Sequence, residues 1–250
     1  MIIAAASDCF PDLSLEDAME RLVDLEYTHV EIALHEQGNQ LKPSEVVADP
    51  QRTLELCRQT QRLTPVAYSI QIDAAGEEHY RQFAACCRLA KATKVAALVI
   101  PGAEQGTPFN EEVEHLRQLV KIATFEGALV AVKTQVGRIT QDPATTTVLC
   151  DNVKGLGITL DPSCFLYAEN AGVSYEQLLK YVYHVHLRDT NKNHFQVRVG
   201  QGDVEYGRLV NQLKQAKYNH ALSVHIQPQP GVDHGGELRK LRLLLDSLIM

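Results

Sequence analysis

Four polar residues with chemically active side chains follow apolar segments in the second half of the chain. Lys133 follows LVAV, Asp161 follows GITL, His186 follows YVYHV and His225 follows ALSV. If these segments are parallel strands of one barrel, the residues at their carboxyl ends meet at one mouth, although they are far apart in sequence. An amine, a carboxylate and two imidazoles can bind a polar substrate and transfer protons. The spacing therefore predicts a polar site at that mouth.

Lys133 and His225 are the candidate catalytic residues of this site. The ammonium of Lys133 could polarise a substrate carbonyl or, less favourably, its amine could form a Schiff base. His225 could act as a general base, because an imidazole titrates near neutral pH. The structural alternatives are an ion pair between Lys133 and Asp161 and a hydrogen-bonded histidine without catalytic function at position 225.

The composition is that of a folded protein that neither binds nucleic acid nor crosses a membrane. The 250 residues are 45% hydrophobic and 22% charged, and the formal net charge is −7. The sequence contains no long basic run that could bind along a phosphate backbone, and no apolar run that is long enough to span a bilayer. The six cysteines form no CxxC pair. This cysteine usage favours a reducing, cytoplasmic location.

Short aliphatic runs recur along the whole chain at the spacing that a strand, a helix and two loops require. They predict one domain over residues 1–250, folded as a (β/α)8 barrel, with a doubly wound open sheet as the competing fold. The eight runs are Ile2 to Ala6, His29 to Ala33, Val66 to Ile70, Val95 to Ile100, Leu129 to Val132, Leu156 to Leu160, Val182 to Leu187 and Leu222 to Ile226.

Helix signals occupy several of the intervals between these runs. Ser14 and Asp17 have the spacing of a capping box, and Asn110 can cap the helical sequence EEVEHLRQLVKIATFE, which ends at Gly127. The last helix is expected over Leu238 to Leu248.

An ordered set of short motifs resembles the xylose isomerase-like barrels of the sugar phosphate isomerase/epimerase superfamily. The motifs are LDPS from Leu160, HVHLRD from His184, VGQGDVEY from Val199 and the terminal LSVHIQP; SLEDAMERLVDLEYTHVEIAL, which contains Glu31, is similar to the family's first helix and second strand. The resemblance implies an isomerase fold that acts on or binds a small carbohydrate or polyol.

The resemblance also implies a divalent metal site, and this chain departs from it. In the family a Glu, an Asp, a His and a Glu at the ends of strands five to eight hold the ion, and the two glutamates exchange protons with the substrate. Asp161 and His186 match their positions, whereas Lys133 and His225 replace the glutamates, and Cys164 stands where DxxH is frequent. The motif therefore predicts a degenerate metal site.

Charge favours an absent metal. A dication 4 Å from the Lys133 ammonium costs roughly 8 kcal/mol at an effective dielectric constant near 20. We therefore expect this ammonium near the metal position, where it neutralises Asp161, and no cofactor. The alternative is one zinc or manganese ion held by Asp161, His186 and His225, with Cys164 as a further possible ligand.

The expected ligand is a small carbohydrate-like molecule. Its candidate binding residues are Glu31, Asp161, His186, Arg188 and Arg198, where clustering of Arg188, Lys192 and Arg198 suits a carboxylate or phosphate.

Three functions follow from the sequence. The first is a metal-free isomerase or epimerase, the second is a non-catalytic protein that binds a metabolite or a partner, and the third is a metal-dependent isomerase with the altered zinc site. A zinc nuclease is disfavoured, because YSIQID and VIPGAE provide no histidine ligands. The oligomeric state is left open.

Overall fold

The computed structural model describes residues 1–249, in which eight parallel strands close into one barrel. Each strand pairs with the next along the chain, and β1 also pairs with β8. The predicted (β/α)8 fold is confirmed, and the open doubly wound sheet is wrong. The strands are β1 Ile2–Ala6, β2 His29–His35, β3 Thr64–Gln71, β4 Ala97–Ile100, β5 Leu129–Lys133, β6 Leu156–Leu160, β7 Val182–Leu187 and β8 Ala221–Val224.

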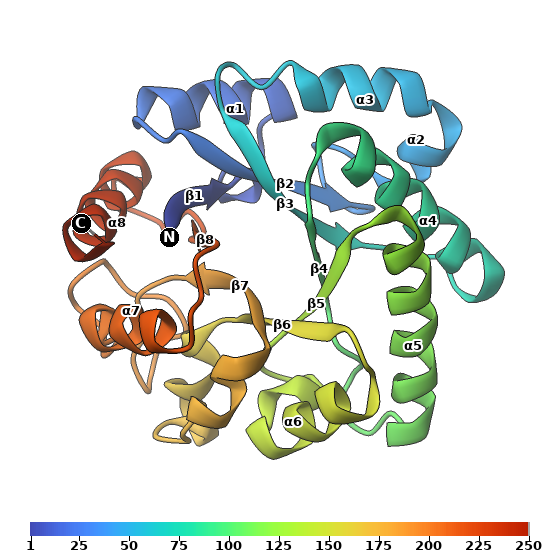
Figure 1. Cartoon of the computed structure of the whole chain (residues 1–250). Helices are drawn as coiled ribbons and strands as arrows, with labels where there is room; N and C mark the ends of the chain where they lie inside the picture. The colour runs from blue at the N-terminus through green and yellow to red at the C-terminus, as the bar shows by residue number, and fades with distance from the viewer. Residues whose placement is uncertain (250) are drawn as a thin grey trace.

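Helices form a ring around the barrel (Figure 1). Three short 3-10 helices replace an α-helix between β6 and β7. No helix within residues 1–249 has the length and apolar character needed to cross a membrane. The α-helices are α1 Leu15–Asp24, α2 Pro43–Ala48, α3 Pro50–Arg58, α4 Gly76–Thr93, α5 Phe109–Glu126, α6 Pro143–Asn152, α7 Tyr206–Gln215 and α8 His234–Ile249. The 3-10 helices are η1 Ser7–Cys9, η2 Ile139–Gln141, η3 Pro162–Phe165, η4 Ala168–Asn170 and η5 Glu176–Tyr181.

The helix ends agree with the sequence signals in part. Ser14 caps α1, since its hydroxyl oxygen accepts a hydrogen bond from the backbone N–H of Asp17 at 3.2 Å. Gly127 ends α5 with a φ of 78°, as predicted. The predicted cap at Asn110 is wrong, because α5 begins at Phe109, two residues before the expected start at Glu111, and Pro108 is the N-cap residue.

The barrel separates an outer core from a small inner one. Tyr68 and Leu98 pack in the large core beneath the helices, whereas Ala67, Ala97 and Val99 form a separate buried cluster. Alternate residues of a strand face opposite sides, so the second cluster lines the barrel interior. Its small side chains leave room for polar groups on the opposite strands.

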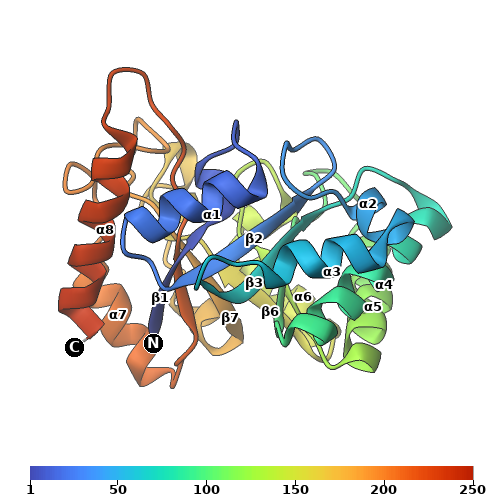
Figure 2. The same cartoon turned by 90° about the horizontal axis from the view of Figure 1, so that it is seen from above.

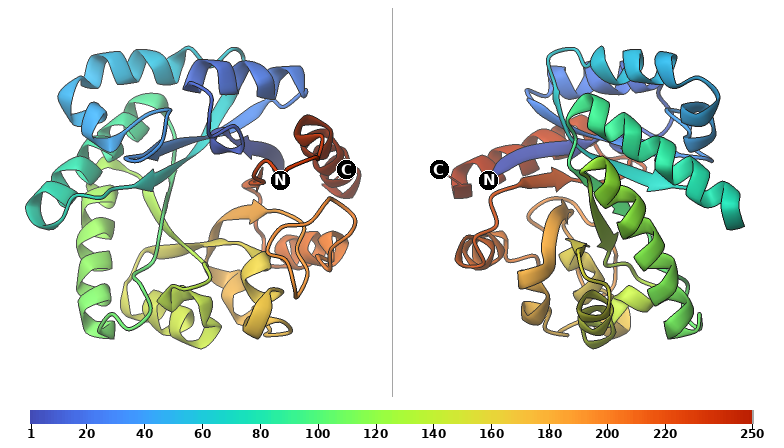
Figure 3. Two further views of the ribbon diagram at one scale, coloured as in Figure 1. Left: turned by 180° about the vertical axis from the view of Figure 1, so that it is seen from behind. Right: turned by 45° about the vertical axis from the view of Figure 1, so that its right-hand side comes forward.

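The carboxyl ends of the strands and the loops that follow them form the mouth, above which the connection from β8 to α8 rises (Figure 2). The view from behind shows the same closed ring of strands inside the helices (Figure 3). After β7, the carboxylate of Asp189 accepts hydrogen bonds from the backbone N–H groups of Gly200 and Gly202 at 2.7 and 3.1 Å. A Cβ at position 202 would lie 2.1 Å from Asp189 Oδ1, so this close approach requires glycine.

Gly157 in β6 provides a test of the packing between β6 and β7. A Cβ at this position would lie 2.1 Å from the ring of Tyr183, at the point where the register of these strands shifts. We expect Gly157→Ala to lower the free energy of unfolding by about 1–3 kcal/mol through overpacking. Urea denaturation measures this change.

Gly207→Ala is the matched control, because its Cβ would have only Leu248 Cδ2 nearby, at 3.8 Å, on helix α7. This variant should be as stable as the parent chain or more stable by up to about 1 kcal/mol. Equal denaturation midpoints for the two variants would contradict the close contact between Gly157 and the ring of Tyr183.

Candidate functional site

A carboxylate on β2 meets two imidazoles on β7 inside the barrel. Glu31 accepts hydrogen bonds from Nε2 of His184 at 2.8 Å and from Nε2 of His186 at 2.8 and 2.9 Å to its two oxygens. The side chains are at most 1% exposed. Strands β2 and β7 are not neighbours, so these bonds cross the interior. They place a buried polar layer beneath the mouth.

The protonation states in this layer follow from burial and from the mutual contacts. Burial alone would raise the pKa of Glu31, but His186 and His184 outweigh it and hold this pKa well below its usual range. Burial lowers the pKa of His186 to about 3, against the opposing effect of Glu31. A neutral His186 that donates from Nε2 keeps a lone pair on Nδ1, and this buried atom has no hydrogen-bond partner in residues 1–249.

A second chain of contacts joins β6, β7, β8 and the loop after β1. Arg188 Nη2 lies 3.2 Å from Asp161 Oδ2 and 2.6 Å from His225 Nδ1, and His225 Nε2 lies 3.1 Å from Asp8 Oδ2. Arginine can only donate, so His225 accepts at Nδ1 and donates from Nε2 to Asp8. The guanidinium thus lies between Asp161 and His225 and fixes the tautomer of that imidazole.

The two carboxylates of this chain are held ionised. Burial alone would raise the pKa of Asp161. The opposing effects of Arg188 and, to a smaller extent, Lys133 help to hold it below its usual value. For Asp8, burial again raises the pKa, and the contacts with His225 together with the nearby His35 lower it by more. The rings of His225 and His186 are stacked, with centroids 4.5 Å apart and an angle of 7° between their planes. This stacking connects the contacts around Arg188 to the buried layer.

The predicted ion pair between Lys133 and Asp161 is wrong, because Arg188 is the residue that contacts Asp161. Lys133 ends β5 and is half-buried, and its ammonium forms no hydrogen bond or ion pair with any described residue. Burial and the nearby Arg188 lower the pKa of Lys133, whereas Asp161, Asp8 and Glu31 raise it. Lys133 is therefore a cation at the mouth with a reduced proton affinity.

Two other expectations need correction. Arg198 lies in the loop after β7, where its side chain is 57% exposed and pairs with Glu237 of α8 at 3.4 Å. Arg188 is 5% exposed and packs under the ring of Phe195, so the expected cluster with Lys192 and Arg198 does not form. Burial raises the pKa of the Cys164 thiol to about 12, so the thiol is protonated at neutral pH in the metal-free protein.

Glu31 also departs from its expected place. It was expected to contact a ligand directly, but both of its oxygens are engaged by histidines beneath the mouth. Its arrangement instead positions His186.

Sequence reasoning missed His184 and Asp8. The alternation in HVHLRD places positions 184 and 186 on one face of a strand, and Asp8 follows the first apolar run just as Asp161 follows the sixth. Asp8 also lines a small cavity of about 120 Å³ at the mouth, together with His35, Asn39, Gln40 and Gln227. Both residues could therefore have been predicted from the sequence.

The residues of the family's metal position do not fit a divalent ion. Asp161, His186 and His225 do not form a group of ligand atoms within 4.8 Å of one another; among residues 1–249 only Glu31, His184 and His186 do. In that group the N and O atoms are 2.8 to 2.9 Å apart, a hydrogen-bond distance. Ligands at about 2.0–2.1 Å from a tetrahedral zinc lie roughly 3.3 Å apart.

The low pKa of His186 predicts a specific acid sensitivity. Between 6.5 and about 3 the unfolded chain binds a proton at this imidazole and the folded chain does not, so stability falls as the pH falls. This group contributes up to about 1.4 kcal/mol per pH unit. We expect His186→Gln to remove that part of the pH dependence in urea denaturation between about pH 6 and pH 4. The exposed His220→Gln should leave it intact; an unchanged slope in His186→Gln would contradict the assignment.

Comparisons with known proteins agree with this architecture. The chain is similar to a xylose isomerase-like TIM barrel protein from Mycobacterium smegmatis in complex with magnesium, with a TM-score of 0.80, 12% identity and coverage of 99% of this chain and 96% of that chain. It is also similar to 3-keto-D-glucoside 4-epimerase from E. coli in its apo form, with a TM-score of 0.75, 15% identity and 99% coverage of both chains.

A third similar structure is the IOLI protein with a bound zinc atom, with a TM-score of 0.75, 17% identity and coverage of 99% of this chain and 98% of that chain. At these identities the likeness shows the fold alone. A comparison with curated protein sequences finds no match. The family model described as xylose isomerase-like TIM barrel matches residues 19–243. Since this match covers most of the closed eight-stranded barrel, the chain belongs to the xylose isomerase-like TIM barrel family.

Proposed function

We propose that the barrel mouth binds a small carbohydrate or polyol and catalyses proton transfer next to a carbonyl without a divalent metal. Two buried acceptor atoms support this most directly: Asp8 Oδ1 and His186 Nδ1 have no hydrogen-bond partner in residues 1–249. Leaving such atoms unpaired costs about 1–3 kcal/mol each. Hydroxyl groups of a polyol would donate to them, whereas an apolar or purely anionic ligand would not.

Arg188 takes the electrostatic role that we first assigned to Lys133. Its guanidinium lies between the side chains at the family's sixth-strand and eighth-strand ligand positions, Asp161 and His225. A dication 4 Å from this fixed charge would cost roughly 8 kcal/mol at an effective dielectric constant near 20. Lysine can escape such repulsion by losing a proton, but arginine cannot. The observed pairing therefore disfavours an ion at this position more strongly than Lys133 alone would.

Lys133 is the better candidate for the proton-transfer group. Its lowered pKa raises the fraction of neutral amine at neutral pH, and its protonated form can stabilise the oxygen of an enediolate. His225 offers no free lone pair while Arg188 donates to Nδ1, so it can act as a base only after that bond breaks. We therefore assign the catalytic role first to Lys133 and second to His225, with Asp161, His186 and Arg188 as ligand-binding groups.

The class of substrate is supported by a structural neighbour, the 3-keto-D-glucoside 4-epimerase, whose name specifies an oxidised sugar derivative. Inversion of a centre next to a carbonyl needs a base on one face of the carbon, an acid that returns a proton to the other face, and a group that stabilises the enediolate oxygen. Lys133 and His225 are the candidates for the base and the acid. A carbonyl-bearing sugar is accordingly the first substrate class to test.

A second candidate function is carbohydrate binding without turnover. The positions of the family's two proton-transfer glutamates hold Lys133 and His225, and the second of these is engaged at both nitrogens. A site of this kind retains acceptors for hydroxyl groups but has only Lys133 available for proton transfer.

A panel of ketoses, keto-glycosides and polyols, screened by thermal shift and then for epimerisation or isomerisation by NMR, tests the proposal. For an active compound, we expect Lys133→Met to lower kcat/KM by about 10²–10⁴-fold. A chelator should leave the rate unchanged. Lys154→Met, which removes an exposed lysine, is the matched control and should retain full activity.

Loss of activity on chelation with recovery on adding Mn²⁺ or Zn²⁺ would contradict the metal-free mechanism. A compound that binds wild type and Lys133→Met but is not converted by either would support the binding function instead.

A further inference from the structure

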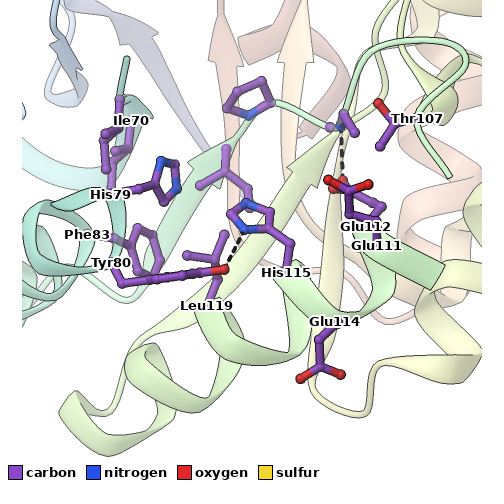
Figure 4. A pocket seen from close by; sticks show the side chains of 15 residues that line it. Ile70, His79, Tyr80, Phe83, Thr107, Glu111, Glu112, Glu114, His115 and Leu119 are labelled. Atoms are coloured by element: carbon purple, nitrogen blue, oxygen red, sulfur yellow. Dashed lines mark hydrogen bonds between the residues drawn. The ribbon is translucent and has the colours of Figure 1, made fainter. Parts of the chain in front are cut away.

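A second, larger pocket lies on the outside of the barrel, between helices α4 and α5 (Figure 4). Its volume is about 650 Å³, within the range of about 300–1,000 Å³ of small-molecule sites. It lies outside the barrel wall, beside the loops after β3 and β4, because its strand residues Ile70 and Ile100 alternate with interior residues and pack in the outer core. None of the groups proposed above for proton transfer lines it.

The pocket is lined by apolar and aromatic side chains. Ile70, Phe83 and Leu119 are among the apolar ones. His79, Tyr80 and His115 gather on one side, with ring centroids 5.0 to 5.7 Å apart, and Tyr80 OH lies 3.1 Å from His115 Nδ1. These surfaces suit a ligand with an aromatic or branched aliphatic body.

The formal charge that lines the pocket is entirely negative. Glu111, Glu112 and Glu114 line it, and no lysine or arginine is among its lining residues. Burial lowers the pKa of His79, and burial together with His79 lowers that of His115 to about 4, so both rings are neutral at neutral pH.

Glu112 is the carboxylate whose position in this pocket is fixed. It is 3% exposed, and its Oε1 accepts a hydrogen bond from the backbone N–H of Ala103 at 3.0 Å, which fixes the carboxylate at the pocket wall (Figure 4). No described residue donates to Oε2. The nearest arginine, Arg138, is instead paired with Glu104 at 3.7 Å and donates to Gly102 O at 3.3 Å. Burial raises the pKa of Glu112, and an adjacent cation would oppose that shift.

We propose that this pocket binds a small organic cation, a protonated primary amine on an aromatic or branched aliphatic body. The body contacts Ile70, Phe83 and Leu119. The ammonium donates to Glu112 Oε2. This inference is independent of the function proposed for the mouth, because it uses other residues and another ligand class.

Three probes that share a phenylethyl or benzyl body and differ in charge test the proposal by isothermal titration calorimetry. They are phenethylamine, which is cationic at neutral pH, 2-phenylethanol, which is neutral, and phenylacetate, which is anionic. We expect phenethylamine to bind at least about tenfold more tightly than 2-phenylethanol, and phenylacetate not to bind. Glu112→Gln keeps the acceptor for Ala103 N–H but removes the charge, and it should lower phenethylamine affinity by about tenfold or more.

Two further variants locate the binding. Glu20→Gln, at an exposed position on α1, should leave the affinity unchanged. Thr107→Trp places a large side chain at the lining of the pocket and should abolish binding while the melting temperature stays near that of wild type. Equal affinities for amine and alcohol, no binding of the amine to folded protein, or undiminished affinity in Glu112→Gln would each overturn the proposal. Self-association that Thr107→Trp disrupts would also overturn it, because a second copy of the chain would then be the occupant.

Discussion

The guanidinium of Arg188 lies between Asp161 and His225, and the arrangement of the mouth depends on this contact. It keeps a buried carboxylate ionised, fixes an imidazole tautomer and joins strands β6, β7 and β8. An arginine cannot lose its proton at any pH that a folded protein tolerates. A positive charge is therefore a permanent part of this barrel at the place where the sequence resemblance implies a metal ion. The site's chemistry must follow from that constraint.

The buried layer beneath the mouth makes this arrangement possible. Glu31 holds His186 from across the barrel, and the flat face of His186 supports His225. The small side chains of β3 and β4, including Ala67 and Ala97, leave the interior space that these polar groups fill. Each charge in the layer has a hydrogen-bonded partner, which is the condition under which buried charges are tolerated.

The fold could be predicted from the sequence because apolar runs, their spacing and the family motifs all indicate one barrel. The end of the barrel at which residues such as Asp161 and His186 lie could also be predicted, since strand direction alone decides which end they reach. The partner of Asp161 could not be predicted, because Lys133 and Arg188 are both cations that could reach it. Which of the two contacts Asp161 depends on how their side chains extend from strands β5 and β7. The role of His184 depends likewise on a contact with β2 that is 153 residues away in sequence.

Crystals of the protein grown with Mn²⁺ in excess, with data collected at the manganese absorption edge, test the central claim most directly. The account predicts that Arg188 still bridges Asp161 and His225 and that no anomalous peak lies between them. A manganese ion coordinated by Asp161 and His186, with Arg188 displaced from both partners, would contradict it.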